Sequence, residues 1–353
     1  MNVLIIGPYL FGGGISTVIN SVLKEKYFSN DIKFGKLNTT QYKHGTRWRN
    51  IIEGIKAYIQ FFRIIWFFDI VHIHASSGKS FYRKSFFIFF AKLLKRKTIL
   101  HIHASHFHEF FLVHHLNLQN IFIKGIFFFT DQIIVLCKNW EIKMLKKFPE
   151  KRLTTIYNPL PIPVVFDNYQ KDKGKCINII FLGFYIKSKG LYDLIETGKR
   201  LIEKRLNFSL TIYGKGELDK TVNELIAKNN LKPFVSNEGW IDGIEKDKIL
   251  READILFLPS YNEGMPMVIL EAMAHGLAIV STDISGIPEQ IVHGKNGFLS
   301  RPGNVDKFVE YLALLIEDNE LRTAMKLNNY ERCSLFNPQK IAHQWESIYR
   351  ALL

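Results

Sequence analysis

The chain is organised around one stretch: Tyr261-Asn262-Glu263-Gly264-Met265-Pro266-Met267-Val268-Ile269-Leu270-Glu271-Ala272-Met273-Ala274-His275-Gly276. The apolar run 255–258 before it, closed by Pro259, predicts a short buried strand. Pro266 suits the first helical position, where its missing N–H costs nothing. Residues 268–275 predict an apolar helix, and Gly276 suits a left-handed stop. The stretch therefore predicts a strand, a tight acidic loop and a helix N-terminus.

Such a helix N-terminus is an expected anion site. Gly264, Met265 and the first turn after Pro266 have backbone N–H groups without helical partners, and the positive end of the helix dipole lies behind them. Phosphate groups are bound in this way at many helix N-termini. We therefore take Gly264, Met265 and Pro266 as candidate phosphate-binding residues.

Two carboxylates accompany this site. Glu263 lies in the loop, and Glu271 lies about a turn and a half into the helix, with its side chain leaning towards the N-terminus. Carboxylates accept hydrogen bonds from vicinal hydroxyls, so a sugar and a ribose on either side of a phosphate suit the pair. The alternative is that Glu263 caps the helix and Glu271 is a solvated helix residue. Burial of Glu271 among apolar neighbours would require a partner.

Length and cysteine content limit the class of protein. The 353 residues suggest two domains. Three widely spaced cysteines, Cys137, Cys176 and Cys333, predict neither a disulfide framework nor a metal cluster and fit a reducing compartment. The N-terminal apolar run reads as a first strand rather than a signal peptide. No apolar run reaches about 18 residues, so we expect no transmembrane helix.

Charge is distributed unevenly along the chain. Residues 1–165 hold 23 Lys and Arg against 8 Asp and Glu, a net charge of +15, whereas residues 166–353 have a net charge of −1. The first segment also holds 20 of the 29 phenylalanines. A basic, Phe-rich half fits an anionic membrane surface better than nucleic acid, whose binding grooves interleave stacking aromatics with basic residues.

The first half alternates predicted strands with helices. Strands are expected at 2–7, 69–74, 98–104 and 131–136, and helices at 17–24, 51–68 and 81–97. The glycine loop that contains Gly13 and Gly14 follows the first strand, but the G-x-G-x-x-G spacing is missing. The basic helix at 81–97 either covers the sheet or contacts membrane. Residues 38–50 read as a solvated loop or an acceptor phosphate site, and residues 107–129 as a Phe-rich insertion suited to a lipid-linked acceptor.

The second half repeats the pattern after a proline- and charge-rich linker at 161–175. Strands are expected at 176–183 and 210–216. Ser188-Lys189-Gly190 follows the first of them and precedes an amphipathic helix that begins at Leu191. Pro338 fits the start of the last helix, which ends at Leu352.

The central stretch, with Glu263 and Glu271 separated by seven residues, closely resembles the signature of glycosyltransferase family 4 (glycosyl transferases group 1). Further blocks resemble the same family: 279–289, 294–299, Asp131–Leu136 and Tyr157-Asn158-Pro159. The resemblance implies an α/β GT-B fold, in which two Rossmann-like parallel-sheet domains face each other across a cleft. It implies an acceptor domain at 1–165, a nucleotide-sugar donor domain at 176–335, and a helix at 337–353 that returns to the first domain.

The resemblance also implies roles for single residues. Gly13 and Gly14 would face the donor phosphates, Lys189 would neutralise the diphosphate, and His103 would face the donor sugar. The loop at Gly214 would lie near the nucleotide. The family usually places an arginine where this chain has Phe184, which leaves one cation fewer for the leaving group.

We therefore expect a retaining glycosyltransferase that uses a nucleotide-diphosphate sugar, with a UDP-sugar favoured. Catalytic contacts are expected from His103, Lys189 and Glu263, and donor contacts from Gly13, Gly14, Gly214, Glu263, Gly264, Met265, Pro266 and Glu271. No two aspartates are two positions apart, so no metal and no other cofactor is expected.

The expected acceptor is a glycan, most simply a polyprenyl-linked one of a bacterial surface polysaccharide such as capsule or exopolysaccharide. The expected location is the cytoplasm, peripheral on the inner face of the cell membrane, with no nucleic acid as partner. Two alternatives stay open: a non-catalytic basic protein of the same fold that binds membrane or nucleic acid, and a sugar-nucleotide epimerase. A nicotinamide dehydrogenase would need the missing G-x-G-x-x-G.

Overall fold

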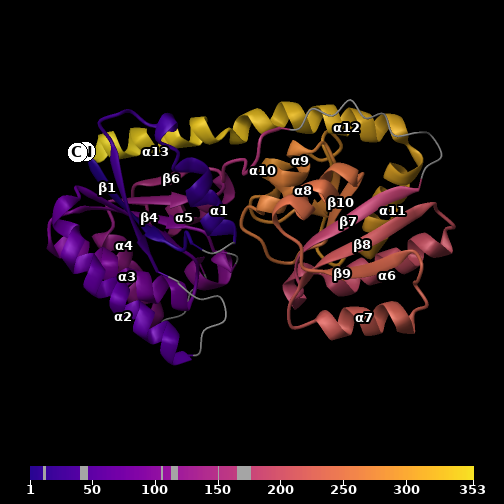
Figure 1. Cartoon of the computed structure of the whole chain (residues 1–353), viewed down its shortest axis with the longest axis horizontal. Coiled ribbons are helices and arrows are strands. Elements are labelled where there is room, and N and C mark those ends of the chain that lie inside the picture. Colours follow the sequence, from indigo (N-terminus) through magenta and orange to yellow (C-terminus); the bar gives the residue numbers. More distant parts are fainter. Residues whose placement is uncertain (11–12, 40–46, 105, 113–117, 150, 165–175) are drawn as a thin grey trace. The chain divides into compact units, whose positions relative to one another are not determined.

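The computed structural model describes residues 1–10, 13–39, 47–104, 106–112, 118–149, 151–164 and 176–353. The chain divides into two compact units (Figure 1). Unit 1 comprises Met1–Pro161 and Phe336–Leu353, and unit 2 comprises Ile162–Leu335. Most of the loop predicted at 38–50 and of the linker predicted at 161–175 lies outside the described residues.

Unit 1 is built on a six-stranded parallel sheet with the strand order β2-β1-β3-β4-β5-β6. Its strands are β1 (Asn2–Gly7), β2 (Lys33–Asn38), β3 (Ile70–Ala75), β4 (Lys97–Ile102), β5 (Gln132–Val135) and β6 (Leu153–Thr155). Every residue of β3 and β5 is buried, as expected for parallel strands covered on both faces. This burial is the reason that short apolar runs predicted the strands.

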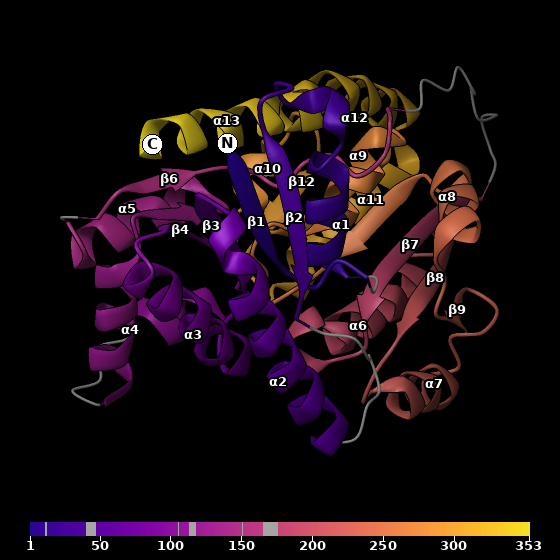
Figure 2. The same cartoon turned by 60° about the vertical axis from the view of Figure 1, so that its left-hand side comes forward.

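Helices cover both faces of this sheet, and Figure 2 shows α2, α3 and α4 on one side and α13 on the other. The helices of unit 1 are α1 (Gly14–Val22), α2 (Arg47–Ile64), α3 (Lys79–Leu93), α4 (Leu118–Phe129), α5 (Lys138–Lys147) and α13 (Pro338–Leu352). Shorter turns are η1 (Glu25–Tyr27), η2 (Ile65–Phe67) and the π-turn η3 (His108–Leu112).

Two predicted helices end earlier than the sequence suggested. The helix predicted at 51–68 is α2, which ends at Ile64 and is followed by η2. The helix predicted at 81–97 is α3, which ends at Leu93. Lys95 takes a left-handed backbone conformation, with φ 59°, and β4 begins two residues later. The basic run at 95–97 therefore makes the turn into a strand instead of a last helical turn.

The segment predicted as a Phe-rich insertion, 107–129, is partly core in its described residues. Phe107 stacks on Trp140 with ring centroids 4.1 Å apart, and Phe111 and Phe127 are fully buried. The phenylalanines there pack against one another and against α3. Aromatic packing within unit 1 therefore accounts for much of this segment's composition, and its role in binding a lipid-linked acceptor stays a prediction.

The C-terminal helix α13 belongs to unit 1. Asn337 caps it by accepting hydrogen bonds from the backbone N–H groups of Gln339 and Lys340, and Pro338 takes the first helical position, as predicted. Trp345 and Tyr349 on its inner face are fully buried. Their rings pack against histidines of β3.

Unit 2 holds a second six-stranded parallel sheet, with the order β12-β11-β10-β7-β8-β9. Its strands are β7 (Ile177–Phe184), β8 (Phe208–Lys215), β9 (Val235–Gly239), β10 (Ile255–Leu258), β11 (Ala278–Thr282) and β12 (Phe298–Ser300). Its helices are α6 (Leu191–Glu203), α7 (Asp219–Lys228), α8 (Gly243–Glu252), α9 (Met267–Ala274), α10 (Ile287–Gln290), α11 (Val305–Glu317) and α12 (Asn319–Arg332), with η4 (Lys187–Lys189) and η5 (Cys333–Phe336) as 3₁₀ turns.

The strand order of unit 2 places a topological switch point between β7 and β10. From β7 the chain builds outwards through β8 and β9, and it then returns to the other side of β7 with β10. Ligands of open α/β sheets bind at the carboxyl ends of the strands that flank such a point. Two parallel, doubly wound sheets confirm the predicted fold class, and the switch point directs attention to the loops after β7 and β10.

The burial of Trp345 generates a stability prediction. Trp345→Ala removes a fully buried indole between α13 and the sheet, and the cavity should cost roughly 3–5 kcal/mol of the free energy of unfolding. Urea unfolding followed by circular dichroism measures the effect. Gln344→Ala changes the neighbouring, exposed residue of α13 and is the control. Equal stability of the two variants would contradict the packing described for α13.

Candidate functional site

The central stretch forms the loop and helix that the sequence predicted, with one shift. Pro266 has an extended conformation, with φ −67° and ψ 126°, and α9 begins at Met267. Pro266 is therefore the residue before the helix and not its first residue; a proline's fixed φ suits either position. Gly276 has φ 70°, so the predicted left-handed stop is confirmed. Gly286 lies beside the loop, since its N–H donates to the Gly264 carbonyl at 2.8 Å.

Glu263 is buried and held from two sides. Its Oε1 accepts a hydrogen bond from Lys189 Nζ at 2.5 Å and one from Ser260 Oγ at 2.9 Å. The side chain of Glu263 is 8% exposed and that of Lys189 18% exposed. No side chain caps α9. The alternative that Glu263 caps the helix is therefore wrong, and the carboxylate faces the lysine of the loop after β7.

Backbone contacts fasten the two loops that carry this ion pair. The Tyr261 N–H donates to the Ser188 carbonyl at 2.8 Å. Gly190 has φ 70°, and a Cβ there would lie 2.0 Å from the Pro259 carbonyl oxygen, so only glycine fits. The turn η4 and the start of the acidic loop are thus in direct contact at the switch point between β7 and β10.

Glu271 has a lysine partner that the sequence analysis missed. Its Oε2 lies 2.5 Å from Lys246 Nζ of α8, and both side chains are largely buried. The other side chains of α9 from Ile269 to Ala274 are buried and apolar. The alternative of a solvated Glu271 is therefore wrong. Lys246 lies one turn into α8 with no distinguishing motif, so only the fold reveals the pair.

The remaining predicted residues of unit 2 lie at neighbouring strand ends. Gly214 is next to last in β8, where a Cβ would lie 1.9 Å from the Gly183 carbonyl oxygen. This close approach of β8 to β7 gives Gly214 a packing role inside the protein. Phe184, at the end of β7, stacks on Trp240 with ring centroids 5.3 Å apart. Two loops and α9 thus carry most of the predicted residues of unit 2, namely Lys189, Glu263, Gly264, Met265, Pro266 and Glu271. Gly214 lies on β8, two strands from β10.

Gly13, Gly14 and His103 belong to unit 1. Gly13 precedes α1 with φ 156° and ψ 161°, a conformation that favours glycine, and nothing lies within 4 Å of a Cβ there. Gly14 is the first residue of α1, whose N-terminus has no side-chain cap. Within the described residues, the space beside Gly13 is therefore free of other atoms, and no side chain caps the N-terminus of α1. Both features suit a helix N-terminus that binds an anion.

His103 is part of a stack of four histidines that the sequence analysis did not foresee. His72 and His74 of β3 lie beside His101 and His103, and His74 Nδ1 is 2.9 Å from His103 Nε2. His72 Nδ1 is 2.7 Å from the Tyr349 hydroxyl of α13. The alternation of side chains along β3 and β4 places all four rings on one face of the sheet. A period-two pattern of histidines in adjacent strands was the available signal.

Burial keeps these imidazoles neutral. It lowers the pKa of His72 and of His103 to about 3, and it holds the pKa of His74 and His101 well below the usual value. Lys84 is fully buried beside them, donates to the His74 carbonyl, and has its pKa lowered by burial to about 7. His103 is therefore a neutral imidazole at pH 7.

Three of these residues are close enough to suggest a metal site. His72, His74 and His101 each offer a ring nitrogen within 4.8 Å of the others. However, the His72 and His74 rings stack with centroids 4.5 Å apart and planes inclined by 21°. Their in-plane lone pairs therefore run side by side instead of converging on one point, and the nearby Lys84 disfavours a cation. The arrangement fits a packed stack better than a metal centre.

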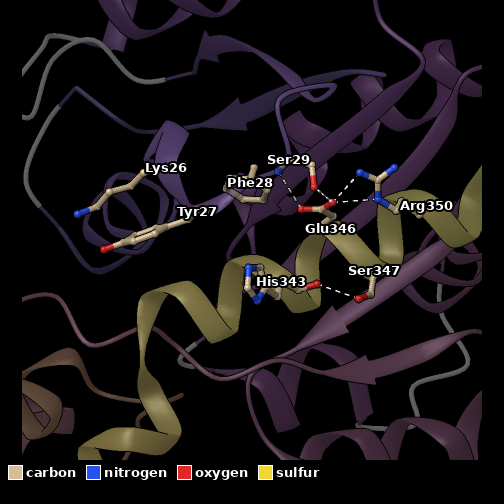
Figure 3. A pocket seen from close by; sticks show the side chains of 8 residues that line it. All are labelled: Lys26, Tyr27, Phe28, Ser29, His343, Glu346, Ser347 and Arg350. Atoms are coloured by element: carbon tan, nitrogen blue, oxygen red, sulfur yellow. Dashed lines mark hydrogen bonds and ion pairs between the residues drawn. The ribbon is translucent and has the colours of Figure 1, made fainter.

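Unit 1 has a separate pocket of about 450 Å³, and none of the predicted site residues lines it (Figure 3). It lies where η1 and the following residues meet α13. Arg350 is occupied by Asp31 at 2.9 Å and by Glu346 at 2.7 Å, and Glu346 also accepts from Ser29. Glu346 and Arg350 are thus already paired, and none of the predicted site residues lines this pocket, so the candidate site remains the switch point of unit 2.

Comparisons with known proteins show which proteins this chain resembles. Residues 166–332 match the family described as "Glycosyl transferases group 1". The uncharacterized glycosyltransferase MJ1178 of Methanocaldococcus jannaschii is 25% identical over 98% of this chain and 96% of that protein. The capsular polysaccharide biosynthesis glycosyltransferase CapM of Staphylococcus aureus is 22% identical, over 64% of this chain and 63% of CapM.

A likeness to solved structures extends over the whole chain. The crystal structure of Anabaena HepE in complex with UDP matches with a TM-score of 0.75 and 15% identity, and the match covers 100% of both chains. At this identity the likeness concerns the fold, and it confirms the predicted GT-B fold.

The histidine stack generates a prediction about acid stability. Above about pH 6.5 the four imidazoles are neutral in both the folded and the unfolded chain. As the pH falls below that value, the unfolded chain binds protons that the folded chain, with pKa values near 3 for His72 and His103, does not bind. The free energy of unfolding should therefore fall by up to about 1.4 kcal/mol per pH unit for each histidine.

Urea unfolding between about pH 8 and pH 5 measures this slope, since acidic groups titrate mainly below that window. His101→Gln should make the slope shallower by one proton. His343→Gln is the control, because that side chain lies in solvent on α13. A free energy of unfolding that stays constant across the window would show that the folded stack accepts protons.

Proposed function

The chain belongs to the glycosyl transferases group 1 family, and we propose that this glycosyltransferase moves a sugar, with retention of configuration, from a UDP-sugar to a lipid-linked glycan. The observation that carries the proposal is the pair of lysine–glutamate contacts beside the N-terminus of α9. The choice of UDP as the nucleotide of the donor is supported by the UDP that is bound to HepE. A bacterial surface polysaccharide as the product is supported by the likeness to CapM.

Each group of this site has a proposed task in holding the donor. Glu271 binds the ribose hydroxyls, and Glu263 binds the hydroxyls of the transferred sugar, since carboxylates accept such hydrogen bonds. Lys189 and the backbone N–H groups of Gly264 and Met265 stabilise the diphosphate as negative charge develops on it during departure. The pairs Lys189–Glu263 and Lys246–Glu271 hold these side chains in place before the donor arrives.

Residues of unit 1 complete the proposed set. Gly13 and Gly14, at the open N-terminus of α1, are proposed contacts of the donor phosphates. His103 is proposed to donate a hydrogen bond to the sugar as a neutral imidazole, oriented by His74. The sugar passes through an oxocarbenium-like state, and lysines and helix dipoles take the place of a metal ion. We assign no protein nucleophile.

Nucleotide-dependent thermal stabilisation tests the donor site. UDP should raise the unfolding temperature with or without EDTA, because a ligand that binds only the folded state stabilises by about 2.7 kcal/mol at a hundred times its Kd. GDP and NAD should give smaller shifts. Glu271→Ala should lose the UDP shift. Glu310→Ala, which removes an exposed ion pair with Lys307 on α11, is the matched control.

The outcomes of this test separate the alternatives. A shift with none of the nucleotides would favour a binding protein of this fold over an enzyme. A UDP shift that survives Glu271→Ala would remove Glu271 from the site. A shift that disappears with EDTA would overturn the metal-independent mechanism.

The surface of unit 1 supports a membrane location for the acceptor. Along α2 and η2, large apolar side chains at spacings of three and four residues are 37% to 58% exposed; this α2 ridge consists of Ile52, Ile55, Ile59, Phe62 and Trp66. Lys56 and Arg63 are exposed on the same helix. Exposed apolar residues continue on α3 and α4, namely Tyr82, Phe89, Leu93, Leu118, Ile121, Phe122 and Phe128.

An anionic membrane is the partner that this surface fits. Apolar side chains can enter the interface while basic residues contact acidic headgroups. A second copy of the chain fits less well, because it would bring together two segments that each carry a net charge of +15 over residues 1–165. Within the described residues, no helix has both the length and the apolar character to cross a membrane. We therefore propose peripheral attachment at the cytoplasmic face of the cell membrane.

Liposome flotation tests the attachment, with vesicles that contain anionic lipid and vesicles that do not. The protein should float with anionic vesicles only. Ile59→Glu should reduce the bound fraction several-fold, because it places a charge on the α2 ridge. Gln60→Glu adds the same charge one residue away, on an exposed position outside the ridge, and should retain most of the binding. An equal loss of vesicle binding in both variants would mean that the added negative charge alone weakens binding, and that the α2 ridge has no role. The proposal would be refuted if the protein did not float with either kind of vesicle.

A further inference from the structure

The charges of the candidate site leave a diphosphate without a net counter-charge. Lys189 is neutralised by Glu263, and Lys246 by Glu271. The sum over these four groups is zero, whereas a nucleoside diphosphate is a polyanion. Helix dipoles supply only partial charges of about half an elementary unit. Binding the diphosphate in unit 2 therefore calls for a further cation at the carboxyl edge of the sheet.

Two lysines stand on the segments at the ends of the central strands β7 and β8. Lys187 lies in η4 and is exposed. Lys215 ends β8 and is half-buried, with Nζ 4.8 Å above the centre of the Trp240 ring. Among the described residues, Lys215 forms no ion pair with a carboxylate. Its positive charge therefore remains available to a ligand.

The position of Lys215 is fixed by its neighbours. The Tyr185 N–H donates to the Lys215 carbonyl at 2.9 Å, and a Cβ at Gly214 or Gly216 would collide with the backbone or ring of residues 183–185. The Trp240 ring, which contacts Lys215, also stacks on the Phe184 ring. The lysine side chain rests on the Trp240 ring of this pair by a cation–π contact. A cation held in this way loses less conformational entropy on binding than the exposed Lys187.

Register connects Lys215 with the position where the family's arginine is missing. Phe184 and Lys215 are direct Cα partners in the parallel pair β7–β8. Side chains at paired positions of adjacent strands point to the same face. A lysine from β8 can thus reach the region above the end of β7, where Phe184 itself offers no charge.

We propose that Lys215 binds the diphosphate of the nucleotide donor, in place of a cation at the end of β7. The inference rests on the proposed function, since it assumes a nucleoside diphosphate as ligand. Phe184 and Trp240 serve as the platform that positions the Lys215 ammonium. The alternative is that Lys215 only covers the Trp240 ring and contributes nothing to phosphate binding.

Isothermal titration with UDP and uridine separates these roles. Lys215→Met keeps the aliphatic stem over Trp240 and removes the charge. It should weaken UDP binding by about tenfold or more and change uridine binding by less than about twofold, because a charge-assisted hydrogen bond to phosphate is lost. Lys215→Arg should retain UDP binding. Lys220→Met, on the exposed face of α7, removes one charge from the same unit and is the control.

A second variant tests the register argument. Phe184→Arg introduced into Lys215→Met should recover much of the lost UDP affinity, because it restores one cation at the partnered position. Unchanged UDP binding in Lys215→Met, or an equal loss for uridine, would overturn the inference while the proposed function stands. Failure of the unmodified protein to bind UDP would overturn both.

Discussion

The contact between Lys189 and Glu263 is the constraint on which the candidate site of unit 2 depends. It joins loops that are 74 residues apart in the chain and that follow the two strands flanking the switch point. Gly190, with its left-handed backbone, and the hydrogen bond between Tyr261 and Ser188 lie where these two loops meet. Together they fix the distance between the loops. Because a buried carboxylate without a partner is costly, the ion pair also limits which strand orders and loop lengths are compatible with this sequence.

Much of unit 2 could be predicted from the sequence because its signals are local. Continuous apolar runs marked the buried parallel strands, and the loop from Glu263 to Pro266 marked a helix N-terminus. The resemblance to glycosyltransferase family 4 added the two-unit fold, whereas the role that it implies for Lys189 stays a prediction. Boundaries were less accurate: Pro266 lies before α9, and α3 ends at Leu93 because Lys95 turns left-handed. Propensity alone does not reveal where tertiary packing starts the next strand.

Partners across the fold could not be predicted because they depend on which elements become neighbours. Lys246 has no motif around it, yet it accounts for the burial of Glu271. Likewise, the histidines of β3 and β4 are unremarkable singly, and only the parallel register and α13 turn them into one neutral stack. In both cases the residue types are visible in the sequence, whereas the neighbours that surround them are a property of the folded unit.

On the proposed assignment, the self-neutralised lysines also bear on turnover. When the nucleotide leaves, Lys189 and Lys246 find Glu263 and Glu271 already beside them, so the vacated site does not expose two bare ammonium groups. Glu263 would thus compete with the departing nucleotide for Lys189 and lower the affinity for spent nucleotide. It would equally weaken the retention of stray phosphate metabolites. The same glutamate that orients an incoming donor would in this way help the protein to discard what it has used.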